Sequence, residues 1–257
     1  MIDVDAITYA YPHSSPIFQD FTWKVERGET WAILGPSGCG KSTLLYLLAG
    51  LRFPSSGKIT IEGQPVVRPR PQTGLILQEY GLLPWATVRQ NASLGLSIRG
   101  FYGPDGKHVP QNFLPAKDVN HWLERLGIAD IQTKYPAQIS GGQRQRSAIA
   151  RTLAIEPDLL LMDEPFSSLD APTRESLQNL TLEIQEESGL TLVIVTHSIE
   201  EAAVLGRKIL LLHQPPNLKA EIIERDPMIR EDFRNTSDYA DLVRDLRQRM
   251  GGGREQH

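Results

Sequence analysis

The chain contains a single cysteine, Cys39, among its 257 residues. One thiol excludes an internal disulfide and is typical of proteins in a reducing compartment. Long apolar runs are missing as well, because the stretches at 159–162 and 209–212 are far shorter than the roughly 20 residues that span a bilayer. The N-terminal stretch MIDVDAITYAY lacks the basic start and apolar core of a signal peptide. We therefore expect a soluble chain. Solubility does not exclude a membrane protein as its partner.

A strong charge of one sign is also absent. Lys and Arg number 27 against 31 Asp and Glu, so the formal net charge is −4, and no overall basic field favours nucleic acid as a partner. Hydrophobic residues make up 40% and charged residues 23%, which is ordinary for a globular protein. The length suits one large domain, or a domain with a subdomain, that buries a core of its own.

Strand-like and helix-like segments alternate along the chain. Apolar or alternating runs predict strands at 30–34, 57–63, 73–78, 158–165 and 190–197. Helical patterns cover 41–49, much of 87–154 and 173–188, with a Pro- and Gly-rich loop at 99–115 and a short helix before the C-terminal glycine tail. Strand–loop–helix units with continuous apolar strands are typical of parallel sheets that are covered on both faces. The sequence therefore predicts an α/β fold.

Residues 35–42, GPSGCGKS, match the phosphate-binding pattern GxxxxGK[ST]. Small residues let consecutive backbone N–H groups turn toward a phosphate chain, Lys41 can reach the β- and γ-phosphate oxygens, and Ser42 can ligate Mg²⁺. The dipole of the following helix favours the same anion. Because the pattern follows a predicted strand and precedes a predicted helix, it predicts a nucleoside triphosphate site. Cys39 is interpreted as a small loop residue and not as a redox switch.

Polar residues follow three other predicted strands. Asp163 and Glu164 end the run LLLMDEP, at the sheet edge where α/β proteins bind ligands. One acid can hold Mg²⁺, directly or through water, and the other can accept a proton from the attacking water. His197 can hydrogen-bond a γ-phosphate, and Gln78 can contact Mg²⁺ or water. Taken alone, each of these last two is more often structural, so their functional interpretation depends on the phosphate loop.

The stretch ISGGQRQR at 139–146 predicts a helix that opens on Ser140, Gly141 and Gly142. A serine hydroxyl, bare amides and the helix dipole make such a start a second anion site. One phosphate loop already serves one triphosphate, so the second half-site indicates a ligand shared between two copies of a two-fold dimer. A plain helix start with flexible glycines is the alternative.

In this order the motifs resemble those of the ATP-binding-cassette (ABC) ATPases, over nearly the whole chain. They are GPSGCGKST at 35–43, Gln78, SGGQ at 140–143, LLLMDEP at 159–165, SSLD at 167–170 and His197. The resemblance implies a P-loop NTPase (RecA-like) core with an antiparallel β subdomain and an inserted α-helical subdomain, and ATP and Mg²⁺ as cofactors. The implied parts of this single domain are a nucleotide-binding core with the β subdomain at 1–83 and 150–225, a helical subdomain with the signature motif at 84–149, and a short C-terminal helix and tail at 226–257.

The resemblance also implies a role for each motif residue. Glu164 would be the catalytic base, His197 the γ-phosphate switch, and Asp170 a link between the two half-sites of the dimer. The SGGQ residues would cap the γ-phosphate of the ATP held by the partner subunit, and Tyr11, with Tyr9 as the alternative, would stack on adenine. The implied nucleotide contacts are Tyr11, Gly35, Pro36, Ser37, Gly38, Cys39, Gly40, Lys41, Ser42, Thr43, Ser140, Gly141, Gly142, Gln143 and Asp170. The implied catalytic residues are Glu164, His197 and Gln78, and the implied metal ligands are Ser42, Gln78 and Asp163.

Residues 77–91, 163–178 and 195–202 are similar to the import ATPases of the nitrate, sulfonate and taurine class. In that class the segment after Gln78 receives a coupling helix from the membrane subunit. The apolar cluster Tyr80, Leu82, Leu83 and Trp85 suits such docking, with core packing as the alternative. The resemblance thus implies a peripheral ATPase at the cytoplasmic face of the inner membrane. Its implied partners are an identical or paired ABC ATPase, permease subunits docking near Gln78–Trp85 and, indirectly, a substrate-binding protein, with no nucleic acid.

Three features depart from that class: the long loop at 99–115, Ile139 where leucine is usual, and Ser198 where aspartate is common. None of them removes a catalytic group. The alternatives are the ATPase of an exporter, a soluble ABC ATPase without a transport role, and a pseudo-enzyme that only binds nucleotide. Intact Lys41, Asp163, Glu164 and His197 argue against the last of these. The sequence does not identify the transported solute.

Overall fold

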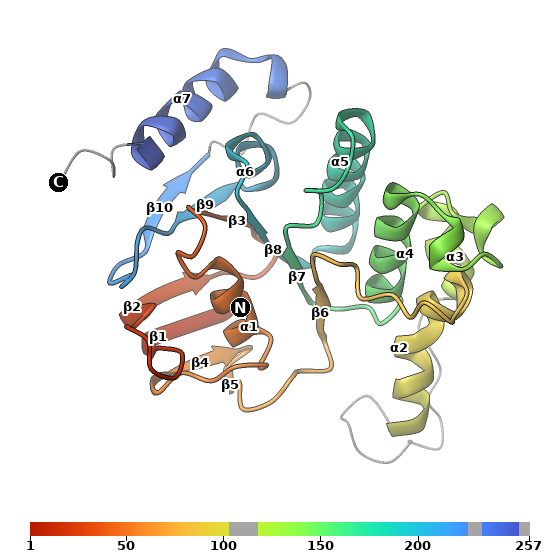
Figure 1. Ribbon diagram of the computed structural model, residues 1–257, viewed down its shortest axis with the longest axis horizontal. Coiled ribbons are helices and arrows are strands. Elements are labelled where there is room, and N and C mark those ends of the chain that lie inside the picture. The colour runs from red at the N-terminus through yellow and green to blue at the C-terminus, as the bar shows by residue number, and fades with distance from the viewer. Residues whose placement is uncertain (103–117, 226–232, 252–257) are drawn as a thin grey trace. The chain divides into compact units, whose positions relative to one another are not determined.

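The computed structural model describes residues 1–102, 118–225 and 233–251 (Figure 1). The chain divides into two compact units, the first formed by Met1–Pro69 and Thr191–His257 and the second by Arg70–Leu190. Residues 103–115 of the loop expected at 99–115 lie outside the described residues. Among those that are described, no helix has the length and apolar character needed to cross a bilayer.

The first unit contains an antiparallel sheet with the strand order β2-β1-β4-β5 (Figure 1). Its strands are β1 (Ile2–Tyr9), β2 (Phe18–Val25), β4 (Ser56–Ile61) and β5 (Gln64–Pro65). In β2 the residues Phe18, Phe21, Trp23 and Val25 are buried, whereas most of those between them are exposed. One face of this strand therefore packs on the core while the other faces water, which is typical of antiparallel sheets.

The first unit also contains four strands in the order β10-β9-β3-β8. They are β3 (Thr30–Leu34), β8 (Thr191–Thr196), β9 (Lys208–Leu211) and β10 (Glu221–Glu224). Strand β3 runs parallel to β8 and β9, and β10 is antiparallel to β9. Every residue of β3 and β8 is buried, as expected for parallel strands covered on both faces.

Within its described residues, the first unit has the α-helices α1 (Lys41–Leu48), α6 (Ile199–Leu205) and α7 (Ser237–Gly251). A 3₁₀ turn, Phe233–Asn235, precedes α7. Helix α6 brings Ala202 and Ala203 against Ala32 and Leu34 of β3. Val243 and Leu246 of α7 complete the same buried cluster. The small alanine side chains let α6 approach the sheet closely, and α7 packs against the same buried cluster.

In the second unit β6 (Thr73–Ile76) runs parallel to β7 (Leu159–Asp163). Its helices are α2 (Val88–Tyr102), α3 (Val119–Arg125), α4 (Gly141–Leu153) and α5 (Ala171–Ser188), with 3₁₀ turns at Ala129–Ile131 and Pro136–Gln138. Helix α4 contacts α2, α3, α5 and β6, so it is the central element of this unit (Figure 1). Arg70 forms a bidentate ion pair with Asp158, close to the starts of β6 and β7.

The predicted loop from residue 99 onward is wrong for residues 99–102, because α2 continues to Tyr102. The Arg99 guanidinium donates hydrogen bonds of 2.6 Å each to the carbonyls of Ile155 and Pro71. These contacts fix the last turn of α2 against segments that are distant in sequence. A local sequence pattern carries no information about such contacts. The strand predicted at 73–78 is also shorter and ends at Ile76, so Gln78 lies in the turn that follows.

We expect Leu246→Ala to lower the free energy of unfolding by about 2–4 kcal/mol, because it leaves a cavity at a fully buried position. Val67→Ala is the control, since Val67 is 71% exposed and its truncation removes little packing. Urea unfolding followed by circular dichroism measures both. Equal, small effects for the two variants would show that α7 does not contribute to the core of the first unit.

Candidate functional site

The parallel register of the first unit brings the phosphate loop and His197 to one edge of its sheet. Leu34, the last residue of β3, pairs with Thr196, the last residue of β8. The loop at 35–42 and His197 therefore leave neighbouring strands at the same level. His197 is exposed there, and Ser198 caps α6, with its hydroxyl accepting a hydrogen bond of 3.2 Å from the Glu201 amide. The serine thus fulfils the capping role open to an aspartate at this position.

The side chain of Lys41 is hydrogen-bonded to the backbone of its own phosphate loop. Lys41 Nζ donates hydrogen bonds of 2.8 Å to the Gly35 carbonyl and 2.9 Å to the Pro36 carbonyl. Gly38 and Gly40 have φ angles of +79° and +106°, which side chains rarely adopt. A Cβ on Gly40 would lie 2.4 Å from Ile17 Cγ2, whereas one on Gly38 would meet nothing within 4 Å. The loop is therefore packed on one side and open on the other, as a cradle for phosphate requires.

Helix α1 begins at the end of this loop without a side-chain cap. Helices α4, α5 and α6, in contrast, are capped by Ser140, Asp170 and Ser198. The first amides of α1 thus lack the acceptor that a capping side chain would supply, and an anion can supply it instead. Cys39 is fully buried in the loop, and this burial raises the pKa of its thiol, with the Lys41 charge acting in the opposite direction. A protonated, inaccessible thiol agrees with the interpretation of Cys39 as a loop residue.

Asn217, to which the sequence pointed by no motif, holds the phosphate loop in place through buried hydrogen bonds. Its side-chain Nδ2 donates to the Cys39 carbonyl at 2.9 Å and to the Ile17 carbonyl at 3.2 Å, and its Oδ1 accepts from the His213 amide at 2.9 Å. Its backbone also exchanges hydrogen bonds with Ile17 and Gln19. Asn217 is 5% exposed, so these bonds lie away from water. They tie the loop after β9 to both the start of β2 and the phosphate loop.

Two aromatic residues compete for the expected contact to adenine. Tyr9 is buried, whereas Tyr11 is half-buried. The Tyr11 hydroxyl lies 3.2 Å from Thr43 Oγ1, directly after the phosphate loop, and the Arg52 guanidinium lies 5.5 Å from the centre of the Tyr11 ring. Of the two, Tyr11 is therefore the ring that contacts the start of α1 and remains partly accessible.

In the second unit the parallel register of β6 and β7 brings Gln78 and the acid pair to one sheet edge. Ile76 pairs with Met162, so Gln78 and Asp163 follow from neighbouring strands. Asp163 is 5% exposed, while Glu164 is half-buried and has a left-handed backbone with φ +46°. Ser167 steadies that backbone, because its Oγ donates a hydrogen bond of 3.0 Å to the Glu164 carbonyl. A non-glycine residue in this conformation is uncommon, and the surrounding structure must hold it there.

The two glycines at the start of α4 are not equivalent in their packing. Ser140 and Gln143 form a capping box, in which Ser140 Oγ accepts from the Gln143 amide at 3.2 Å and Gln143 Oε1 accepts from the Ser140 amide at 2.9 Å. A Cβ on Gly142 would lie 2.6 Å from Thr173 Cγ2, so packing against α5 excludes a side chain there. A Cβ on Gly141 would meet nothing closer than 3.7 Å. Packing within the chain therefore requires glycine at 142 but not at 141.

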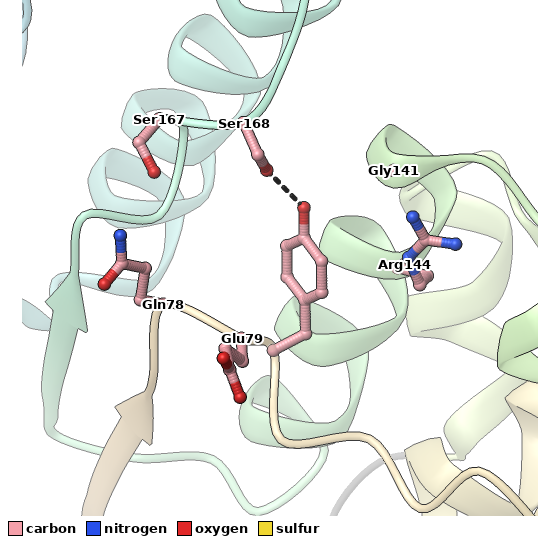
Figure 2. Close-up of a pocket in the computed structure, with 7 residues that line it drawn as sticks. Gln78, Glu79, Gly141, Arg144, Ser167 and Ser168 are labelled. Atoms are coloured by element: carbon pink, nitrogen blue, oxygen red, sulfur yellow. Dashed lines mark hydrogen bonds between the residues drawn. The ribbon is translucent and has the colours of Figure 1, made fainter.

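Gly141 faces a pocket of about 480 Å³ that lies within the second unit (Figure 2). The residues that line it are Gln78, Glu79, Tyr80, Gly141, Arg144, Ser167 and Ser168. Three predicted motifs thus meet at one cavity: the segment that starts at Gln78, the SGGQ helix start and the turn after the acid pair. Glu79, Arg144, Ser167 and Ser168 carried no functional assignment from the sequence, and their proximity to Gln78 depends on the fold.

Asp170 ends the turn after the acid pair and caps α5. It accepts hydrogen bonds from the Thr173 hydroxyl at 3.1 Å and the Thr173 amide at 3.3 Å. These bonds, the hydroxyl first, lower the pKa of the exposed Asp170 carboxyl. The carboxylate therefore stays ionised well below neutral pH. Within a single chain it already has a structural role, as the N-cap of α5.

Each unit by itself carries donors of the kinds that bind a nucleotide or Mg²⁺. The phosphate loop offers amides, a lysine and the Ser42 hydroxyl, and the second unit offers the nearly buried Asp163 carboxylate and the Gln78 amide. Groups of three or more His, Cys, Asp and Glu side chains that could hold a metal do not occur among the described residues. Mg²⁺ needs no such cage, because it usually takes one or two protein oxygens, water and phosphate oxygens.

We expect Asn217→Ala to weaken ATP binding about tenfold, because the Cys39 carbonyl and the loop around it lose a buried donor. Equilibrium titration with a fluorescent ATP analogue, at a temperature where circular dichroism shows both proteins folded, gives the dissociation constants. Leu218→Ala is the matched control, because this neighbour is 55% exposed. Unchanged affinity in Asn217→Ala, even with a lower melting temperature, would show that Asn217 does not shape the phosphate loop.

Comparison with known proteins was consistent with this geometry. The ABC transporter family matches residues 18–167. The chain is 39% identical over 231 residues to the taurine import ATP-binding protein TauB of Pseudomonas aeruginosa, covering 90% of this chain and 82% of that protein. It is 41% identical over 233 residues to the nitrate import ATP-binding protein NrtC of Synechococcus elongatus, covering 89% of this chain but only 34% of that longer protein.

Solved structures give the same result. A dimeric ATP-binding cassette, MJ0796, in a post-hydrolysis state with ADP and Pi, is similar with a TM-score of 0.71 and 28% identity, over 88% of this chain and 100% of that one. The protein cbiO1 of Clostridium perfringens, part of the ABC transporter complex cbiONQ, is similar with a TM-score of 0.74 and 27% identity, over 98% and 96% of the two chains. The predicted α/β fold is thereby confirmed as that of an ABC ATPase cassette. From its motifs, its fold and these relatives, the chain belongs to the ABC transporter family and is one of its ATPases.

Proposed function

We propose that this ABC ATPase powers a membrane importer of small anions or related small solutes, of the nitrate, sulfonate and taurine type. The names of its relatives support that class. The observation that carries the proposal is Trp85, which is 73% exposed in the segment that follows Gln78. The exposed indole of Trp85, in the same segment as the half-buried Leu82 and Leu83, supplies apolar area that a partner can cover.

On the nucleotide, we assign the following roles. Lys41 and the amides of residues 35–43 bind the β- and γ-phosphates, and Ser42 of the first unit and Gln78 and Asp163 of the second would hold Mg²⁺. The accessible ring of Tyr11 stacks on adenine. When bound, Mg²⁺ neutralises charge that develops on the phosphate oxygens. His197 contacts the γ-phosphate and senses its loss.

Glu164 is the proposed catalytic base. It accepts the proton of the attacking water while Gln78 orients that water, which is the positioning that phosphoryl transfer needs most. The half-buried Glu164 carboxylate lies at the carboxyl end of β7, held by a backbone conformation that the Ser167 contact supports. Its geometry therefore depends on the turn that follows it, at 164–170.

Two copies of the chain, or this chain and a paired ABC ATPase, share the nucleotides. Ser140, Gly141, Gly142 and Gln143 of one copy cap the γ-phosphate bound to the phosphate loop of the other, and Asp170 links the two half-sites. The packing around Gly141 supports this role, because a Cβ there would make only ordinary contacts of 3.7 Å or more, so packing within the chain does not explain the glycine. ATP closes the dimer, and hydrolysis reopens it.

We call residues 78–85 the docking segment and propose that the membrane permease binds there. Of its apolar cluster, Trp85 is exposed, whereas Tyr80, Leu82 and Leu83 are half-buried. Core packing thus accounts in part for three of these side chains, and Trp85 is the main contact offered to a partner. The chain acts at the cytoplasmic face of the inner membrane, and a substrate-binding protein delivers the solute to the permease on the other side.

The experiment is affinity purification of the tagged full-length chain from its own cells in a mild detergent. We expect a polytopic membrane protein to co-purify and Trp85→Ala to reduce its yield at least about tenfold, as for the loss of a central aromatic contact. Phe101→Ala is the matched control, because Phe101 is a comparably exposed aromatic residue of the same unit, at 68%. Capture that Trp85→Ala leaves intact would place the permease elsewhere, and soluble partners alone, with ATPase activity retained, would contradict the importer.

A further inference from the structure

Tyr80 lies in a strained turn inside the docking segment. Its backbone is left-handed, with φ +63°, and Gly81 follows with φ +61°. Such a conformation is costly for a tyrosine, so surrounding contacts must impose it. Arg151 of α4 supplies them, because its guanidinium donates to the Tyr80 carbonyl at 2.9 Å and to the Gly81 carbonyl at 2.5 Å. The turn is therefore fixed from the helix that carries the SGGQ motif.

The Tyr80 side chain reaches from this turn to the one that carries the catalytic base. Its hydroxyl lies 2.5 Å from Ser168 Oγ, a hydrogen bond across the pocket of the second unit (Figure 2). Ser168 follows Ser167, whose own hydroxyl donates to the Glu164 carbonyl. Through Tyr80, the docking segment thus contacts the turn at 164–170. The contact is at Ser168, four residues after Glu164.

The same ring also contacts the start of α4. The Arg144 guanidinium carbon lies 5.9 Å from the centre of the Tyr80 ring, and a Cβ on Gly141 would lie 3.8 Å from the Tyr80 hydroxyl. Tyr80 therefore connects the docking segment, to which it belongs, with two other elements: the base-bearing turn and the SGGQ helix start. All three line one pocket.

We propose that Tyr80 is a positioning residue for hydrolysis, which sets the turn that presents Glu164 through its hydrogen bond to Ser168. Because small displacements of a catalytic group cost large factors in rate, a shift of this turn changes turnover more than it changes ATP binding. A permease that moves the docking segment then changes the ATPase rate through Tyr80. This last step rests on the proposed function, whereas the first concerns the chain alone.

The first step is tested on the isolated chain with a double-mutant cycle. We expect Tyr80→Phe and Ser168→Ala each to lower kcat for ATP hydrolysis about fivefold, the size of one lost hydrogen bond, with the KM for ATP within about twofold of the parent. The double variant should be no slower than either single one, because both remove the same bond. Tyr135→Phe, at an exposed tyrosine of the same unit, is the control, and Glu164→Gln gives the lower limit of the rate.

Equal melting temperatures for the parent and both single variants would assign the loss to positioning and not to unfolding. An unchanged kcat in Tyr80→Phe, or losses that multiply in the double variant, would overturn the proposal. A rise in KM with kcat intact would do so as well, because it would give Tyr80 a role in binding ATP.

The second step is tested on the detergent-purified assembly with the membrane protein. The ratio of its ATPase rate to that of the isolated chain, measured for the same variant, reports coupling, and we expect Tyr80→Phe to bring this ratio close to one. A ratio equal to the parent's would overturn the coupling role. If no membrane protein co-purifies with the parent chain, the proposed function and this coupling role fail together, while the double-mutant cycle still decides the first step.

Discussion

Parallel strand pairing is the constraint on which the rest of the molecule depends. Because parallel strands end at a common edge, the register Leu34–Thr196 in one unit and Ile76–Met162 in the other determines which residues can act together. The phosphate loop and His197 follow the first pair of strands, and Gln78 and the acid pair follow the second. The ends of four short, mostly apolar strands thus carry the phosphate loop, His197, Gln78 and the acid pair.

The loops at these strand ends are held in conformations that they would not adopt alone. In the phosphate loop, glycines with positive φ permit the turn, and Asn217 holds it from a segment that is remote in sequence. In the second unit, Tyr80 and Glu164 adopt left-handed backbones that Arg151 and Ser167 support. Preorganisation of this kind suits a catalyst that works mainly by positioning phosphate, water and base.

The elements that local pattern determines could be predicted from the sequence. The buried strand at 30–34 and the helix start at Ser140 agree with the structure because continuous burial and a capping box both leave a local signature. Strand β1 has a weaker signature in the sequence, because the register shifts in its pairing with β2 break the alternation of buried and exposed residues. The contacts of Arg99 and Asn217, and the meeting of Tyr80 with Ser168, join residues far apart along the chain, so only the fold reveals them.

Mixing two inactive variants tests most directly the claim that one ATP is shared between two copies. Lys41→Ala removes the phosphate contact, and Gly141→Asp adds a negative charge at a position where a Cβ would meet no atom closer than 3.7 Å. In a mixed dimer, the intact loop of one copy meets the intact helix start of the other. We predict that each variant alone lacks ATPase activity and that an equal mixture recovers about a quarter of the parent's rate, since half of the dimers are mixed and each has one intact site. A mixture as inactive as its components would contradict the shared site.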